Sequence, residues 1–181
     1  SNKDEGKKVG LTNATAAFLY YESILQDSVR ATLTFTDTGG VIDNKTAMAG
    51  LPIVGQENVA IKVRDNNDNE LKMTLYVNSI TPLIEDTRKS IVQLSLASKE
   101  FLMNEKVRIN TRLNGKVSDH VKKILEDLGT EKETDIEETQ HEQNCIGNNK
   151  KPFYLINWLS RGAVPKTGSS GDTAGYFFWE T

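Results

Sequence analysis

The sequence predicts a mainly β protein, in which an antiparallel β-barrel is followed by the start of a small α+β domain. Apolar and polar residues alternate in several short segments before residue 114, as in strands with one buried face. Beyond that point apolar residues recur every three or four positions, as in amphipathic helices. We therefore expect a flexible segment at 1–14, a barrel domain at 15–113 and an incomplete α+β domain at 114–181.

Five segments of the first part show the alternation of half-buried strands. In Ser28–Thr36, apolar side chains occupy every second position, with arginine or threonine between them. Polar runs suited to turns separate the strands, most clearly Asp37–Gly40, the hairpin loop Asp65–Glu70 and Asn114–Gly115. Short strands joined in this way are typical of an antiparallel sandwich or barrel. The other expected strands are Glu57–Asp65, Leu71–Asn78, Ile91–Ser98 and Lys106–Leu113.

A first helix is expected just after the last of these turns. Ser118 can cap a helix over residues 119–128, because its hydroxyl can accept a free N–H of the first turn. Gly129 has the position of the glycine that commonly ends a helix. His120 has charged neighbours and is expected on the exposed face. Residues 130–142 then carry six acidic side chains and a single apolar anchor, Ile136, which predicts an exposed loop or at most a strand.

The stretch KPFYLINWLSRGA, residues 151–163, predicts a second helix. Pro152 suits its first turn, where no N–H is needed, and Gly162 suits its end. On its apolar face we expect Phe153 and Trp158 in the core, although two aromatic side chains could instead stack on a ligand.

The last part of the chain predicts a flexible loop at 164–173 and a strand at 175–181. Because the sequence stops at Thr181 within this aromatic segment, we expect a fragment of a longer protein.

The composition indicates a globular protein with no electrostatic preference for nucleic acid. Hydrophobic residues make up 37% and charged residues 26%, which favours a folded chain over a disordered one. The net charge is −3 and the cations are scattered, so no basic face is expected. One cysteine, Cys145, excludes an internal disulfide framework and favours a reducing compartment. No apolar run approaches the roughly 20 residues that span a bilayer.

No constellation of residues predicts catalysis, so we expect no enzyme, no cofactor and no metal. His141 and Cys145 are four positions apart and could share a metal ion, but a structural zinc site needs four ligands and a solvated loop is favoured. Cys145 also lacks the basic neighbours that would activate a nucleophilic thiol. The run Asp65–Glu70 lacks the glycine and glutamate spacing of a calcium loop. The acids of residues 131–142 could attract a basic partner or form a solvated face.

Four segments of the chain together carry a family resemblance. They are the opening strand with its approach at 20–37, the segment LPIVGQENV at 51–59, the helix with its turn at 113–128, and the aromatic helix at 151–163. The second of these is similar to a P-I-x-G-x-E-x-V pattern that leads into a barrel strand. In order and spacing, the chain from Tyr20 to Thr181 resembles the central baseplate hub protein of contractile-tailed bacteriophages, which is related to type VI secretion spike proteins.

The resemblance implies a structural protein of the virion, located in the tail baseplate and assembled in the host cytoplasm. Hub proteins of this family have tail-tube-like barrels and form a trimeric ring that links the central spike to the tail tube. A homo-oligomer with spike and tube proteins as partners is therefore expected, with no specific nucleic-acid binding and no membrane insertion. A second barrel is expected beyond Thr181.

The residues expected at a partner interface lie at two places. One is the segment before the first strand, with Tyr20, Tyr21 and Leu25. The other is the approach to the next strand, with Leu51, Pro52, Ile53 and Gly55. The alternative function is a free-standing β-rich module that binds a peptide or a carbohydrate, for which exposed aromatic residues on loops are expected.

Overall fold

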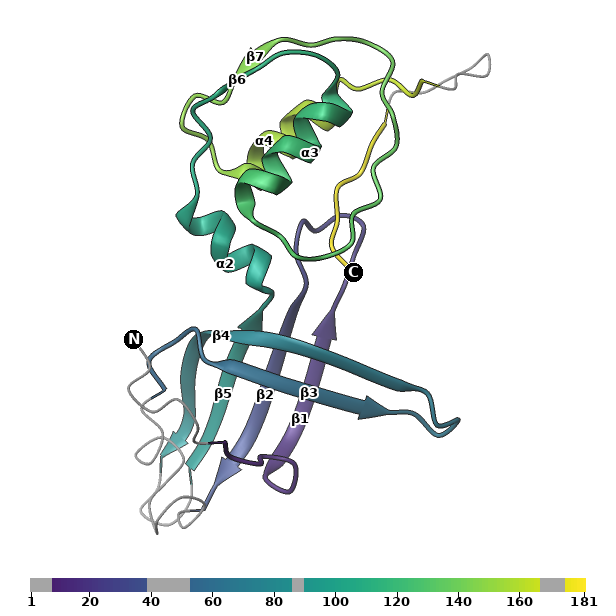
Figure 1. Cartoon of the computed structure of the whole chain (residues 1–181). Helices are drawn as coiled ribbons and strands as arrows, with labels where there is room; N and C mark the ends of the chain where they lie inside the picture. Colours follow the sequence, from purple (N-terminus) through teal and green to yellow (C-terminus); the bar gives the residue numbers. More distant parts are fainter. Residues whose placement is uncertain (1–7, 39–52, 86–89, 167–174) are drawn as a thin grey trace. The chain divides into compact units, whose positions relative to one another are not determined.

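The computed structural model describes residues 8–38, 53–85, 90–166 and 175–181, and these form two compact units (Figure 1). The first unit comprises Ser1–Tyr21 and Arg30–Ser98. The second comprises Glu22–Val29 and Lys99–Thr181. The short segment Glu22–Val29 therefore joins two strands of the first unit while belonging to the second.

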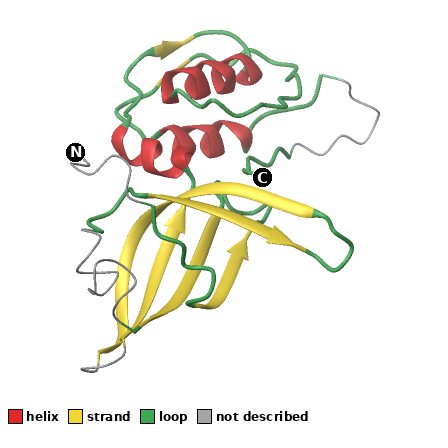
Figure 2. Ribbon diagram, turned by 60° about the horizontal axis from the view of Figure 1, so that its bottom comes forward, coloured by secondary structure: helices red, strands yellow, loops and turns green. Residues whose placement is uncertain are grey.

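The first unit is a curled half-barrel of five antiparallel strands, in the order β1-β2-β5-β4-β3 (Figures 1 and 2). The second unit adds helices and a two-stranded β6-β7 ladder. The prediction of a mainly β fold with an α+β part is thus confirmed. The strands of the half-barrel are β1 (Thr15–Tyr21), β2 (Arg30–Asp37), β3 (Asn58–Arg64), β4 (Glu70–Glu85) and β5 (Ser90–Ala97).

The two central strands form the core because their apolar residues alternate with polar ones. On β2, Leu33 and Phe35 are buried while the intervening Thr34 is half-buried. On β5, Leu94 pairs in register with Leu33 and is also buried. Successive side chains of a strand point to opposite faces, so this alternation turns one continuous apolar surface to the inside of the curl.

Strand β4 is 16 residues long and serves two neighbours in turn. Its first half, from Glu70 to Tyr76, pairs with β3, and its second half, from Tyr76 onward, pairs with β5. Register shifts lie between Val77 and Ser79 and again near Pro82, and such bulges bend a strand. In both views the β3–β4 ribbon crosses the other strands at a steep angle (Figures 1 and 2).

Two strand predictions need correction in this region. Strand β1 was not among the five expected, although it pairs with β2 from Thr15 to Tyr21. The strand expected at Lys106–Leu113 is wrong, because helix α2 (Lys99–Lys106) occupies its start. Only its end, Arg112–Leu113, is a strand, β6, which pairs with β7 (Cys145–Ile146).

Helix α2 was missed because it buries polar side chains and has no apolar stripe. The Asn104 side chain is 5% exposed and accepts the Phe153 N–H at 2.9 Å. Glu100 is 7% exposed and accepts the Thr130 hydroxyl at 2.9 Å. Both residues link the helix to other segments of the second unit, and polar groups with such a structural role leave no periodic signal in the sequence.

Helices α3 (Val117–Leu128) and α4 (Pro152–Ser160) form the core of the second unit, and both were expected. Gly129 has the left-handed conformation, φ 77°, as expected for the residue that ends a helix. The Phe153 ring lies 5.2 Å from that of Phe178, centroid to centroid. The buried apolar side chains of α3 and α4 are Val117, Val121, Ile124, Leu125, Leu128, Phe153, Leu155, Ile156 and Leu159.

The expected cap of α3 is wrong in its details. The cap position is Lys116, whose side chain makes no capping hydrogen bond. Ser118 is instead buried, and its backbone N–H donates to the Thr139 hydroxyl at 3.1 Å. A side chain from the acidic segment therefore satisfies a free N–H of the first turn.

His120 is also placed differently from expectation. It is 2% exposed, and its Nε2 donates to the Gln143 carbonyl at 2.7 Å. The charged neighbours in sequence point elsewhere, because residues one and two positions away lie on other faces of a helix.

The C-terminal segment is extended but is not the expected strand. Residues 175–181 have no strand partner among the described residues. Tyr176 and Phe178 pack against the core of the second unit, whereas Phe177 and Trp179 are exposed. Burial alternates along this segment without the ladder hydrogen bonds of a strand.

Candidate functional site

The β3–β4 ribbon is the most distinctive surface element of the first unit. Between Glu70 and Tyr76, β4 pairs only with β3, and the loop that joins the two strands extends past the edge of the half-barrel (Figures 1 and 2). An isolated two-stranded hairpin is marginally stable in water. Side-chain contacts near the end of the ribbon are therefore needed to stabilise its hairpin structure.

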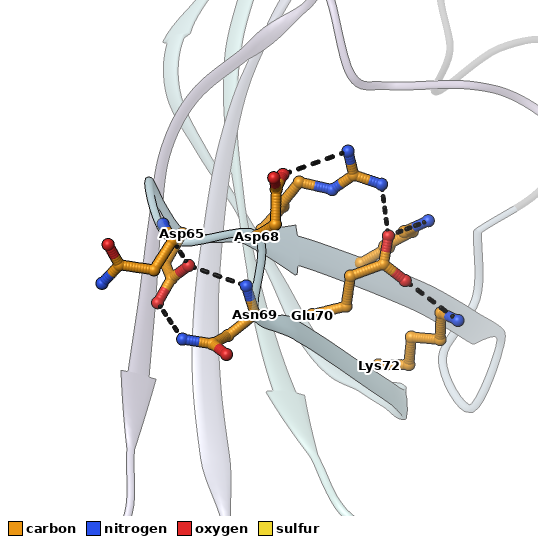
Figure 3. A network of polar contacts seen from close by, with 8 residues as sticks. Asp65, Asp68, Asn69, Glu70 and Lys72 are labelled. Carbon is orange, nitrogen blue, oxygen red and sulfur yellow. Dashed lines mark hydrogen bonds and ion pairs between the residues drawn. The ribbon is translucent and has the colours of Figure 1, made fainter.

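A carboxylate on one face of the ribbon gathers three cations (Figure 3). Glu70 Oε1 lies 2.8 Å from Lys62 Nζ and also contacts the Arg64 guanidinium, while Oε2 lies 3.1 Å from Lys72 Nζ. These hydrogen bonds, that from Lys62 first, hold the pKa of Glu70 below its ordinary value. Lys62 and Lys72 are direct cross-strand partners, so Glu70 offsets a like-charge pair that would otherwise destabilise the ribbon.

The loop of the ribbon is fixed by a second carboxylate. Asp65 accepts the backbone N–H groups of Asn67 and Asn69 at 2.7 and 2.8 Å, and the Asn69 side-chain amide at 2.7 Å (Figure 3). The side-chain hydrogen bond from Asn69 is the main reason that the pKa of Asp65 is lowered. Asp68 adopts a positive φ of 62°, which aspartate tolerates in turns. The run expected to be a hairpin loop is one, and its oxygens bind its own backbone.

The opposite face of the ribbon is apolar. Cross-strand pairs on this face are Val59 with Leu75, Ile61 with Met73 and Val63 with Leu71. Burial falls along the ribbon, from 3% exposed at Leu75 to 42% at Val63 and 50% at Leu71. The apolar stripe therefore continues past the point where the half-barrel covers it. We call Val63 and Leu71 the ribbon tip.

The first group of expected interface residues lies at the exposed end of β1. Tyr21 is 47% exposed, and Leu25, within the segment that follows β1, is 78% exposed. Tyr20 is half-buried. Strand β1 pairs with β2 alone, so its other edge has no strand neighbour in the described part of the chain. Strand β3, at the opposite end of the sheet, likewise pairs only with β4.

The second group forms part of a turn in the residues that the structure describes. Leu51 and Pro52 lie outside the described residues. Gly55 has φ 112°, a conformation that favours glycine, and its N–H donates to the Glu57 carboxylate at 2.9 Å. The Glu57 carboxylate also accepts the Val54 N–H at 2.9 Å. The G-x-E part of the sequence pattern thus forms a tight turn before β3, in which Ile53 is half-buried.

In the part of the chain that the structure describes, no candidate catalytic or metal-binding residues come together. Within the described residues, no three histidine, cysteine or acidic side chains are grouped as metal ligands. Burial raises the pKa of the Cys145 thiol above its ordinary value, which is the opposite of activation. His141 is exposed. Among the described helices, none combines the length and the apolar character needed to cross a bilayer.

Helix α4 presents a second exposed surface that the sequence interpretation missed. Phe153 is buried as expected, but Trp158 is 47% exposed, so the expectation of a core tryptophan is wrong. Tyr154, one turn earlier, is 56% exposed. Their i, i+4 spacing was the available signal, since it separates them from the stripe of Phe153, Ile156 and Leu159.

Comparisons with known proteins give a result only at the level of structure. No family model matches the sequence, and no curated protein matches it. A solved structure of the Escherichia coli c3393 protein is similar over 86% of this chain, with a TM-score of 0.56 and 14% identity. That protein is a component of the type VI secretion system with structural similarity to the T4 bacteriophage tail proteins gp27 and gp5.

A second structure points the same way. The 43 kDa tail protein of prophage MuSo2 from Shewanella oneidensis matches 91% of this chain, with a TM-score of 0.52 and 16% identity. The chain has the fold of a phage tail protein. The resemblance inferred from the sequence is thereby confirmed for the fold. The matches cover 41% and 49% of the two solved chains, so this chain spans less than half the length of each.

Proposed function

We propose that the protein is a structural component of a phage tail baseplate hub, which links the central spike to the tail tube in a ring assembly. The observation that carries the proposal is the likeness of most of the chain to a prophage tail protein and to a secretion component that resembles gp27 and gp5. The proposal includes the predicted division into a barrel domain and an α+β domain, a virion location and a non-enzymatic role.

The half-barrel suits a ring because its sheet has two open edges. In the described residues β1 and β3 each pair on one side only, and unpaired strand edges readily accept another strand. If the β1 edge of one copy meets the β3 edge of the next, the contact is heterologous and closes a ring when the rotation permits. A trimer is the closed assembly that we propose. In it, Tyr20, Tyr21 and Leu25 lie close to such an interface.

The ribbon tip supports a further contact with a partner subunit. Val63 and Leu71 expose apolar surface on an element whose geometry is already fixed by Asp65 and Glu70. A surface that is ordered before binding loses little conformational entropy on association. We propose that this tip packs on the tube or spike protein.

Co-purification tests this proposal. The tagged chain is expressed together with the tail-tube and spike proteins of the same phage, and the captured material is examined by mass spectrometry and electron microscopy. We expect capture of both partners, and its loss in Val63→Lys/Leu71→Lys. Leu83→Lys is the matched control, because Leu83 is 50% exposed at the other end of β4. Capture of neither partner by the unmodified chain, in a preparation that assembles tails, would rule the hub role out.

A second candidate function is a module that binds a peptide or a carbohydrate. The observation that favours it is the exposure of two aromatic side chains on a non-helical segment, Phe177 at 58% and Trp179 at 45%. Such side chains commonly stack on ligands. If the chain is a stable monomer, a peptide or carbohydrate ligand should raise its melting temperature. Such a rise, absent in Trp179→Ala, would favour this function over the hub role.

A further inference from the structure

The outer face of α4 is a compact surface of aromatic and cationic side chains. Tyr154, Trp158 and Arg161 are spaced i, i+4 and i+7, which places them on one side of the helix. All three are exposed, Tyr154 at 56% and Trp158 at 47%. The ammonium group of Lys150 lies 5.3 Å from the centre of the Tyr154 ring. We call Lys150, Tyr154, Trp158 and Arg161 the α4 face.

The chemistry of the α4 face is that of a binding surface for an acidic segment. Trp, Tyr and Arg are the residue types that most often dominate the energy of protein interfaces. The sequence contains no acidic residue between Glu142 and Asp172, so no carboxylate on this stretch competes for the cations. Neither Lys150 nor Arg161 has a carboxylate partner in the described part of the chain. The other two nearby lysines are already paired, Lys151 with Glu105 and Lys166 with Glu138.

The same chain carries an acidic segment of complementary character. Glu133, Asp135 and Glu137 are exposed and form no ion pair with any described residue. All three side chains are exposed, whereas Ile136, between Asp135 and Glu137, packs on the core. We call Glu133, Asp135 and Glu137 the acidic strip.

We propose that the acidic strip of one copy docks on the α4 face of a second copy. In an extended conformation the acidic strip would be about 13 Å long, and α4 rises about 10 Å from Tyr154 to Arg161, with Lys150 in the segment before the helix. The two outer carboxylates then face the two cations, with Trp158 and Tyr154 between them excluding water.

This contact joins two different surfaces and therefore leaves one of each free on every dimer. Contacts of this kind close into rings or continue as chains. The inference rests on the proposed function only in that the protein associates with copies of itself. It names the surfaces of the second unit through which two copies contact each other. It requires no contact from the sheet edges.

Charge reversal with complementation tests the contact. One variant, Lys150→Glu/Arg161→Glu, reverses the α4 face, and another, Glu133→Lys/Glu137→Lys, reverses the acidic strip. Association of the full chain is measured by sedimentation equilibrium up to about 1 mM, high enough to populate a weak contact. Circular dichroism verifies that each variant folds, and Lys123→Glu, at an exposed position of α3, is the control.

We expect each reversal alone to weaken association roughly tenfold, because like charges then face each other. Mixing the two variants is expected to restore it, since each mixed contact again joins opposite charges, and the control is expected to behave as the unmodified protein. A chain that stays monomeric at 50 mM salt, or reversals that leave association unchanged, would overturn the proposal. Capture of tube and spike proteins by the same variants is measured separately. The hub role can therefore be supported when this contact is disproved, and this contact can be supported when the hub role is disproved.

Discussion

Replacement of Glu180 by alanine is expected to loosen the second unit, because this one carboxylate ties two distant segments together. Its Oε2 accepts the Val29 N–H at 2.9 Å, across 151 positions of sequence. Its Oε1 lies 2.7 Å from Lys132 Nζ, as an ion pair that is not aligned for a hydrogen bond. The Glu180 side chain is only 7% exposed, and Val29 is 3% exposed.

The magnitude follows from what the substitution leaves behind. In Glu180→Ala the buried Val29 N–H has lost its acceptor, which costs about 1–3 kcal/mol. The ion pair contributes less than about 1 kcal/mol, because the Lys132 side chain is 44% exposed and, when released, has water and the Thr181 carbonyl oxygen, 3.2 Å away, as partners. We therefore expect a loss of about 2–3 kcal/mol, with Glu180→Gln costing less because it keeps an acceptor oxygen.

Urea denaturation followed by tryptophan fluorescence measures this loss. The chain has two tryptophans, Trp158 and Trp179, and both lie in the second unit, so the signal reports on that unit. Glu180→Gln is the control, since it removes the charge of the ion pair and keeps an acceptor oxygen for Val29. A Glu180→Gln variant as unstable as Glu180→Ala, or a loss below about 0.5 kcal/mol in the latter, would refute the reasoning.

Three further predictions concern the core, a glycine and the ribbon. Phe153→Ala is expected to lower the free energy of unfolding by about 3–5 kcal/mol, because Phe153 is 2% exposed. Trp158→Ala, at a 47% exposed position, is expected to lower it by less than about 1 kcal/mol. Equal losses of stability in denaturation experiments would contradict the orientation of α4. Gly147→Ala is expected to destabilise by about 1–3 kcal/mol or more, because its Cβ would lie 2.5 Å from the Ile109 carbonyl oxygen. Ile109→Ala should give no rescue in a double-mutant cycle, since that oxygen remains. Because the pKa of Glu70 is lowered, its ion pairs stabilise the folded state fully at a pH above its ordinary pKa of 4.5. This stabilisation is lost as the pH falls through the lowered pKa. An NMR titration of Glu70 with a midpoint at or above pH 4.5 would contradict this prediction.

Sequence periodicity correctly predicted the helices and strands that bury one face and expose the other. Helices α3 and α4 and strands β2 and β5 each bury one regular stripe, so their pattern follows directly from the packing. Helix α2 was not predicted because its buried residues Glu100 and Asn104 are polar and form hydrogen bonds with distant segments. No local pattern encodes such partners.

The candidate surfaces were harder to predict than the fold. The alternation in β3 and β4 gave the two faces of the ribbon, but whether Val63 and Leu71 are covered depends on where β4 changes partner, at Tyr76. That change is a property of the whole sheet. For Trp158, apolar character alone suggested the core, although its angular position on the helix was the better guide.

The segment Glu22–Val29 has a consequence for the order in which the protein is made. Strands β1 to β5 are complete once residue 97 has left the ribosome, and domains commonly fold as they emerge. The connection between β1 and β2 cannot then reach its final state, because the carboxylate that holds it, Glu180, is made only after the helices of the second unit. A half-barrel formed early must keep this connection available until Glu180 has been made. Loss of Glu180 would therefore affect a part of the molecule that was made among the first.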